Sequence, residues 1–417
     1  MPFPRFLEIE QKVYARRVRD ISAAVAEACA ASGLNRRVKR GESVAVTVGS
    51  RGLANLPVIV RSVVDAVKAL GAKPFILPAM GSHGGATAAG QTAMLESLGV
   101  TPASVGAPLR AGMAAEKIGE TSHGVAVYAA REALKADRVI VMNRIKQHTD
   151  FEADYESGLM KMLAIGVGKR EGAMAMHSRL CASLCDDLPQ AAVLLLRVLP
   201  VAAGIAILEN GYNDTAEIVG LAPAEIPARE KELLRKERRT ASRLPFKEVD
   251  LLLVDWMGKD ISGLSMDTHV LDRRMLWEAP YFRGPQWRIR LVAALDLTKA
   301  SHGNPLGIGL ADLMTERLCR KIDLEALKIN VLHTGWLNRA KLPLCYKDDR
   351  AILEAAHIAL GRPDPKQVRM VRIRDTLRLG RMWISEGLLP DALAHPKVTV
   401  LSDPRPVTFT RDGRFAF

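Results

Sequence analysis

The stretch ESVAVTVGSRGLANLPVIVRSVVDAVKALGAKPFILPAMGSH (residues 42–83) decides the fold class. It begins with a β-branched run at 42–49, continues with apolar residues at helical spacing over 56–70, and ends in a second apolar run at 73–80. Two strands joined by a helix pack as parallel neighbours in one sheet. The stretch therefore predicts a βαβ unit and, with it, an α/β fold.

The same alternation continues along the chain. Further strands are expected at 137–145, 201–211, 249–258, 289–298 and 329–335, and further helices at 86–99, across most of 158–186, before Pro200, and at 224–240, 309–322 and 348–361. A chain of 417 residues is too long for one ordinary domain. We predict two α/β domains with mostly parallel sheets, residues 1–246 and 247–417, with the active site at their interface.

The charge and the apolar runs exclude two classes of partner. The net charge is +13, but the basic residues are scattered, and the densest run (229–243) alternates in sign at helical spacing. A solvated helix explains that run better than a nucleic-acid surface, so we expect small anions rather than nucleic acid as ligands. The longest apolar stretch, 191–208, is interrupted by Arg197 and Pro200, so we expect no membrane span.

Cysteine usage and the opening sequence indicate the cellular compartment. The five cysteines contain no CxxC pair, and Cys181 and Cys185, four residues apart, are read as packing residues. The opening MPFPRFLEIEQKV lacks a cationic region followed by an apolar run, so we expect no secretory signal. Together these features predict a cytoplasmic protein with reduced thiols.

Polar residues follow three successive predicted strands. Ser50 and Arg51 come after the first, His83 after the second and His148 after the third. Ligands of open parallel sheets bind outside the carboxyl ends of the strands, so a convergent site is favoured over coincidence. Histidine titrates near neutral pH, and the planar fork of arginine suits a carboxylate. These residues predict proton transfer at a carbon atom beside a carboxylate.

A lysine and another histidine lie in an unusually apolar segment, KQHTDFEADYESGLMKMLAIGVGKREGAMAMHS (146–178). Lys161 stands between GLM and MLAIGVG, and His177 comes near the end of the segment. A lysine in such surroundings is partly desolvated, which favours its neutral, nucleophilic form. The glycines of GVGKREG (166–172) match neither a P-loop nor a dinucleotide fingerprint. We interpret His123, His357 and His395 as ordinary hydrogen-bonding residues of loops.

These blocks resemble the racemases and epimerases that use a nickel-pincer cofactor, typified by nickel-dependent lactate racemase. The resemblance rests on GSH at 81–83, KQHTD at 146–150, SGLMKMLAIGV at 157–167 and MHS at 176–178. The resemblance implies a nicotinate-derived mononucleotide that carries two sulfur-bearing arms and is joined covalently to a lysine. Nickel would be held by the two sulfurs, a ring carbon and a histidine, a ligand set suited to square-planar nickel.

Carried over residue by residue, the resemblance implies a role for each candidate. Lys161 would carry the cofactor, His177 would bind nickel, and His83 and His148 would be the paired acid and base. Ser50 and Arg51 would bind the cofactor, and Arg51 would also anchor the substrate. The implied reaction removes a hydroxyl proton while the α-hydride moves to the cofactor ring, and return of the hydride to the other face inverts the carbon. Separate cofactor maturation proteins are implied as partners.

The chain departs from the lactate enzymes in its substrate residues. Val48 replaces the acidic residue that precedes their anchor arginine, and KDISGLSMDTHVLDRR (259–274) replaces their aromatic–glutamine–lysine cluster. The nearest substitutes are Lys259, Asp267, His269 and Arg273, joined by His302 and Asn304. We therefore expect a 2-hydroxy acid other than lactate, with Lys259, Arg273 and His302 beside Arg51 as substrate contacts.

Two other functions are open at this point. A metal-dependent hydrolase would use the same histidines as direct ligands and would not need Lys161. A non-catalytic carrier or sensor of the cofactor would need Lys161 but not the histidine pair.

Overall fold

The computed structural model describes residues 3–149, 151–179, 182–273, 288–334 and 336–416. The chain forms two compact units. We call Ala15–Ala241 the central unit, and the described residues up to Tyr14 together with the described residues from Ser242 onward the terminal unit. Within the described residues, none of the helices has both the length and the apolar character needed to cross a membrane.

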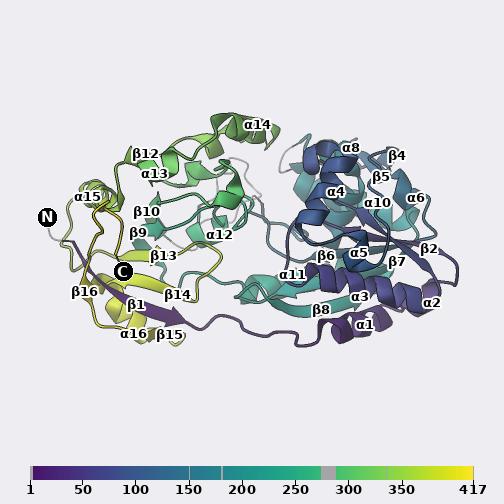
Figure 1. The fold of residues 1–417 in the computed structure, drawn as a ribbon, viewed down its shortest axis with the longest axis horizontal. Coiled ribbons are helices and arrows are strands. Elements are labelled where there is room, and N and C mark those ends of the chain that lie inside the picture. Colours follow the sequence, from purple (N-terminus) through teal and green to yellow (C-terminus); the bar gives the residue numbers. More distant parts are fainter. Residues whose placement is uncertain (1–2, 150, 180–181, 274–287, 335, 417) are drawn as a thin grey trace. The chain divides into compact units, whose positions relative to one another are not determined.

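The central unit is built on a five-stranded sheet with the order β3-β2-β6-β7-β8 (Figure 1). Its strands are β2 (Ser43–Val48), β3 (Lys73–Pro78), β6 (Arg138–Arg144), β7 (Val201–Glu209) and β8 (Thr215–Leu221). The first four are parallel, and β8 is antiparallel to β7. Helix α3 (Leu56–Ala69) joins β2 to β3, so the predicted βαβ unit is confirmed.

The two faces of this sheet are covered by different helices. Helix α1 (Ile21–Ala31) and α3 share a core with alternate residues of β7, including Ala203 and Ile205. Gly204 points to the other face, since successive residues of a strand alternate. There Leu159 of α7 (Leu159–Lys161) and Ile226 of α11 (Ile226–Thr240) lie close to Gly204. Helices α7 and α11 therefore pack on the same face of the sheet.

Shorter elements complete the central unit. They are α2 (Leu34–Arg37), η1 (Gly84–Ala86), α4 (Ala88–Ser97), α5 (Pro102–Val105), β4 (Ala115–Glu120), β5 (Ala126–Ala130), α6 (Arg131–Leu134), η2 (Met162–Val167), α8 (Lys169–Met176), η3 (Ser183–Asp187), α10 (Leu188–Val198) and η4 (Pro223–Glu225). Helix α10 ends before Pro200 and β7 begins after it, as the sequence predicts, because proline lacks the N–H that a helix interior needs.

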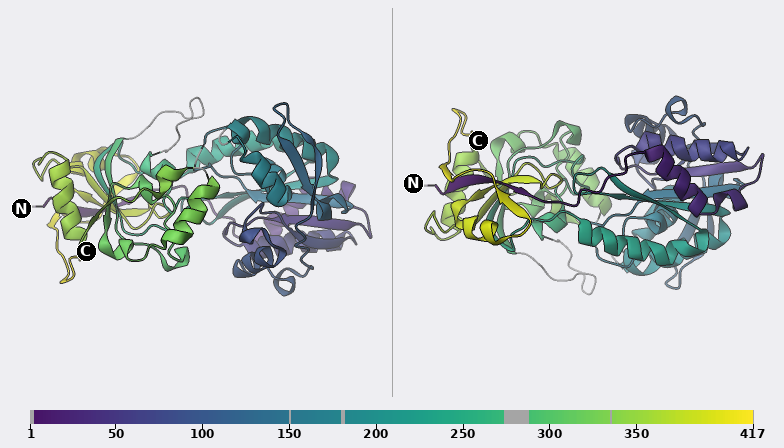
Figure 2. Two further views of the ribbon diagram at one scale, coloured as in Figure 1. Left: turned by 90° about the horizontal axis from the view of Figure 1, so that it is seen from above. Right: turned by 90° about the horizontal axis from the view of Figure 1, so that it is seen from below.

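The terminal unit holds a nine-stranded mixed sheet in the order β12-β11-β10-β9-β13-β14-β1-β15, with β16 beside β1. The strands are β1 (Arg5–Gln11), β9 (Glu248–Val254), β10 (Arg288–Ala294), β11 (Leu313–Thr315), β12 (Leu344–Tyr346), β13 (Met370–Ile373), β14 (Arg381–Ser385), β15 (Val398–Val400) and β16 (Arg405–Pro406). Strands β9 to β13 run parallel. Figure 2 shows the purple N-terminal strand among the yellow C-terminal strands.

Helices of the terminal unit are short. They are α12 (Thr268–Leu271), η5 (Lys299–Ser301), η6 (Ile308–Leu310), α13 (Glu316–Cys319), α14 (Leu324–Thr334), η7 (Leu337–Ala340), α15 (Asp349–Ala359), η8 (Glu386–Leu388) and α16 (Leu389–Ala394). Strand β1 belongs here because it pairs antiparallel with β14, β15 and β16, whereas the predicted boundary at 246 groups it with the first domain.

Two predicted elements of the terminal unit are wrong. Residues 329–334 lie in helix α14 rather than in a strand, and Gly335 lies outside the described residues. The Asp323 carboxylate accepts hydrogen bonds from the backbone N–H groups of Glu325 and Ala326 and so starts this helix upstream of the apolar run. The predicted helix 309–322 is instead strand β11 followed by the short helix α13, which Thr315 caps.

Candidate active site

The polar residues that follow β3, β2 and β6 lie at one edge of the central sheet. These three strands are neighbours and run parallel, so their carboxyl ends meet there. A hydrogen bond joins Ser50 Oγ, after β2, to His83 Nδ1, after β3. The structure thus brings together two residues that are 33 positions apart in sequence.

A buried amide and a buried lysine support the loop that bears His83. Gln91 of α4, fully buried, donates through Nε2 to the carbonyl oxygens of Gly81 (2.9 Å) and His83 (3.3 Å). Lys169 Nζ donates to Pro78 O (2.6 Å) and to Gln91 Oε1 (3.2 Å). Burial lowers the pKa of Lys169 to about 8. Neither residue could be predicted from the sequence. The helix that holds Gln91 and the glycine-rich run that holds Lys169 show no pattern that indicates a buried polar contact.

The segment that carries Lys161 is helical in three parts: α7, the π-helix η2, and α8. Gly166 lies so close to the residue after β3 that a Cβ atom there would be 2.6 Å from Ala79 O. The backbone N–H of Gly81 also donates to Gly166 O at 3.3 Å. The segment is therefore packed directly against the chain that leads to His83. π-Helical turns are rare and occur frequently at functional sites.

His177 ends this helical segment, and Lys161 lies near it in space. Solvent reaches the His177 imidazole, but the surrounding protein and then the charge of Lys161 lower its pKa to about 4. Imidazole binds a metal in its neutral form. The His177 imidazole is thus neutral at neutral pH, and Lys161, on the same helical segment, is half-buried. This pair fits a lysine-attached cofactor whose metal takes one histidine.

His148 is held after β6 through its backbone and its ring. Its N–H donates to the Glu156 carboxylate, and its ring centroid lies 4.6 Å from that of the fully buried Phe151. Glu156 is itself buried and forms an ion pair with Arg238 of α11. Burial raises the pKa of Glu156, and the charge of Arg238 opposes that rise.

Arg51 gives the same edge a positive charge. Its side chain is exposed, and desolvation by the protein around it, followed by the charge of Arg144, lowers its pKa. Arg144 pairs with Glu209, the last residue of β7. Arg51 remains a cation at neutral pH, because the ordinary pKa of a guanidinium group lies far above 7. The planar guanidinium group of Arg51 can donate two parallel hydrogen bonds to a carboxylate or a phosphate.

The charged run 229–243, read from the sequence as a solvated helix, is solvated on one face only. Glu230 and Glu237 are buried together with Leu233 and Leu234. Glu237 Oε2 accepts hydrogen bonds from the backbone N–H (3.2 Å) and the side chain (3.1 Å) of Gln147, next to His148. The alternating charges of α11 therefore divide between a solvent face and contacts with the candidate site.

The terminal unit places the predicted substrate residues in its own loops. Lys259 Nζ donates to Gly263 O at 2.9 Å, and Asp267 caps α12 by accepting from the N–H of the buried His269. Arg273 donates to Leu310 O (2.9 Å) and Arg290 O (2.9 Å) and pairs with Asp312 (2.7 Å). His302 is exposed, with a backbone φ of 47°. Arg274, which ends the quoted run 259–274, lies outside the described residues.

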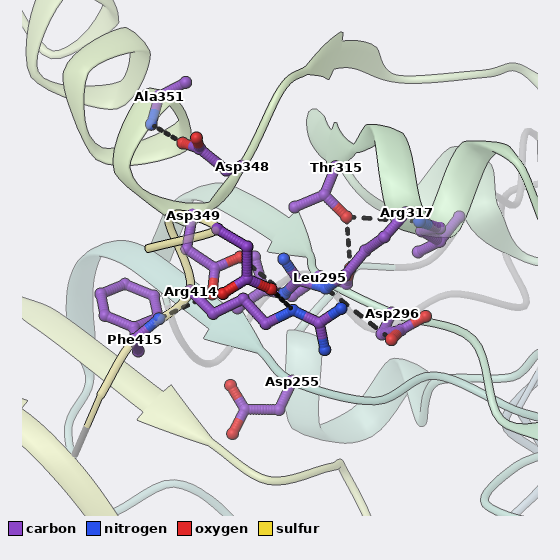
Figure 3. Close-up of polar contacts among 12 residues, drawn as sticks. Asp255, Leu295, Asp296, Thr315, Arg317, Asp348, Asp349, Ala351, Arg414 and Phe415 are labelled. Carbon is purple, nitrogen blue, oxygen red and sulfur yellow. Dashed lines mark hydrogen bonds and ion pairs between the residues drawn. The ribbon is translucent and has the colours of Figure 1, made fainter. Parts of the chain in front are cut away.

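The carboxyl edge of the terminal sheet holds an internal charge network (Figure 3). Arg317 of α13 lies between Asp349 (2.6 Å) and Asp296 (3.7 Å), and both carboxylates are nearly buried. Asp349 Oδ2 also accepts from the N–H of Phe415 at 3.0 Å. These ion pairs join α13, α15 and the C-terminal segment, and they give this edge a structural role.

Two further predictions concern histidines and cysteines. His123 is bonded through Nδ1 to the buried Asp187 at 2.8 Å, which confirms its interpretation as a loop hydrogen-bonding residue. Cys185 is partly buried, and Cys181 lies outside the described residues. Within the described ranges, no three His, Cys, Asp or Glu side chains come together as a metal site.

One family model and a solved structure are similar to parts of this chain. Residues 6–185 match the family model of the lactate racemase N-terminal domain. No curated protein matches the chain. A similar solved structure is the lactate racemase apoprotein from Thermoanaerobacterium thermosaccharolyticum, with 12% identity, a TM-score of 0.45, and 69% of each chain covered. The matched residues include all three strand ends, Lys161 and His177. Residues 6–185 of this chain are thus similar to the lactate racemase N-terminal domain, and the match ends before the second half of the chain.

Proposed function

We propose that the protein is a nickel-pincer-dependent racemase or epimerase of a 2-hydroxy acid other than lactate. The observation that carries this proposal is the placement of Lys161 and His177 on one helical segment that packs against the strand-end loop of His83. A cofactor that is joined to a lysine and whose metal is bound by a histidine needs both residues at one site, with the imidazole neutral.

The residues that would hold the cofactor are all in the central unit. Lys161 would form the covalent link, His177 would supply the protein ligand to nickel, and Ser50 and Arg51 would bind the nucleotide's polar groups. When bound, the cofactor supplies an acceptor that takes up a hydride and returns it.

The chain's own side chains would perform the proton chemistry. Arg51 holds the substrate carboxylate with its fork, which fixes the orientation of the hydroxyl-bearing carbon. His83 and His148 follow β3 and β6, the strands on either side of β2, so that one can take the hydroxyl proton of one enantiomer and the other that of its mirror image. The hydrogen bond to Ser50 orients the ring of His83, and Phe151 supports the ring of His148.

Substrate contacts outside this edge are proposed in the terminal unit. Lys259, Arg273 and His302 are the candidates, and Arg273 already binds carbonyl oxygens and Asp312 there. The resemblance also implies maturation proteins that make and load the cofactor.

The decisive experiment is the intact mass of the denatured protein, co-produced with pincer-synthesis enzymes, beside Lys161→Ala. We expect an adduct in the wild type that is absent from the variant, followed by racemisation in a screen of 2-hydroxy acids. A known racemase loaded in parallel controls for maturation. An unmodified wild type beside a loaded control would refute the proposal.

The same samples separate the alternatives. A hydrolase would contain zinc bound by side chains and would tolerate Lys161→Ala; such catalytic sites take three protein ligands. A cofactor carrier would show the adduct but no turnover of any 2-hydroxy acid.

A further inference from the structure

A buried glutamate contacts the start of the helical segment that carries Lys161. Met160 N donates to Glu230 Oε2 at 2.9 Å, and the backbone N–H of Leu159 also bonds to this carboxylate. Glu230 is 1% exposed. The first N–H groups of a helix have no partner within the helix, so an acceptor from another element must satisfy them when they are buried. Glu230 of α11 is that acceptor.

Gly158 provides the room for this contact. A Cβ atom at residue 158 would lie 2.1 Å from Glu230 Oε1 and 2.6 Å from its Cδ. The φ of Gly158 is −172°, which any residue adopts, so the glycine is required for space rather than for backbone conformation. From the sheet side, Asn143 Nδ2 donates to Gly158 O at 2.9 Å. The chain that leads into Lys161 is therefore held by the sheet and by α11.

From these contacts we propose that Glu230 is a positioning residue for Lys161. It acts through the backbone of Leu159 and Met160, the two residues that directly precede the lysine. Movement of this short turn would shift the Lys161 side chain relative to His177 and the strand-end histidines. The inference rests on the proposed function, because it assigns Lys161 its role as the attachment point.

The same helix also supports His148, which strengthens the assignment. Arg238 of α11 pairs with Glu156, which accepts the N–H of His148, and Glu237 binds the preceding Gln147. Helix α11 thus contacts the start of the Lys161 segment through Glu230 and, about two turns later, the residues that hold His148.

The test compares Glu230→Met with Glu230→Gln in the cofactor-loaded protein. Both variants remove the charge and keep the length of the side chain, but only glutamine keeps an oxygen that can accept from Met160. The readouts are the adduct fraction by intact mass, and kcat and KM per loaded enzyme with the 2-hydroxy acid that the wild type turns over. Glu232→Met, on the solvent side of α11, is the matched control.

We expect Glu230→Met to lower kcat per loaded enzyme by about 10-fold or more, with KM nearly unchanged, because misplacement of a reacting group acts on the chemical step. Glu230→Gln should recover most of that loss, and Glu232→Met should match the wild type. Equal kcat values in Glu230→Met and the wild type would overturn the inference. Equal losses in the Met and Gln variants would also overturn it, since the acceptor would then be irrelevant.

Gly158→Ala provides a second test that does not depend on the folding of the methionine variant. Its methyl group collides with the Glu230 carboxylate, so we expect it to reduce kcat in the wild-type background and much less in Glu230→Ala. Additive losses would contradict the proposed contact. A wild type with neither adduct nor racemisation would instead refute the proposed function, before any variant is compared.

Discussion

Replacing Glu230 by glutamine should make the central unit more stable, and increasingly so as the pH rises. Burial raises the pKa of Glu230 from 4.5 to about 7, even though the N–H groups of Met160 and Leu159 act in the opposite direction. Each pKa unit corresponds to about 1.4 kcal/mol, so the difference between the folded and unfolded states amounts to an upper value of about 3 kcal/mol.

The sign follows from which state ionises first. Below pH 4.5 the Glu230 carboxyl is protonated in both the folded and the unfolded chain, so its ionisation does not change the free energy of unfolding. Between pH 4.5 and 7 the unfolded chain loses the proton while the folded chain keeps it, so the wild type loses stability as the pH rises. Above pH 7 the loss is complete. Glutamine does not ionise, so its advantage should be near zero at pH 4 and largest at pH 8.

Urea unfolding of the unloaded protein from pH 4 to pH 8.5 measures this difference. Residues 15–241 contain no tryptophan, so hydrogen exchange of peptides that cover 155–165 reports on the central unit, while tryptophan fluorescence reports on the remainder of the chain. Glu232→Gln, which changes an exposed carboxylate of the same helix, should show no such pH trend. An advantage of Glu230→Gln that is absent or that shrinks with rising pH would refute the reasoning.

Three other variants test the central site. His148→Ala should abolish racemisation while intact mass still shows the adduct on Lys161; retained turnover would remove this histidine from the mechanism. His177→Ala should keep the adduct but lose nickel in metal analysis of the purified protein, and an unchanged nickel content would exclude it as the ligand. Gln91→Leu removes the buried amide that accepts from Lys169 and donates to the carbonyls of the His83 loop, and should lower the free energy of unfolding by about 1–3 kcal/mol. A denaturation midpoint equal to that of the wild type would contradict the last expectation.

Local patterns in the sequence determined the fold class and the candidate residues. The βαβ unit at 42–83, the break at Pro200 and the residues after β2, β3 and β6 follow from periodicity and from proline chemistry, which act over a few neighbouring residues. The apolar surroundings of Lys161 could be read in the same way.

Contacts between distant segments were decided only by the tertiary structure. Nothing near β1 in sequence indicates that it pairs with strands almost 400 residues away, because a strand's pattern shows which face is buried but not which edge it joins. Likewise, the charges of α11 look solvated until packing on β7 places Glu230 against the N–H groups before Lys161. Sequence identifies side chains that can do chemistry, and the fold determines which buried partners hold them, because a hydrogen bond depends on distances that only packing sets.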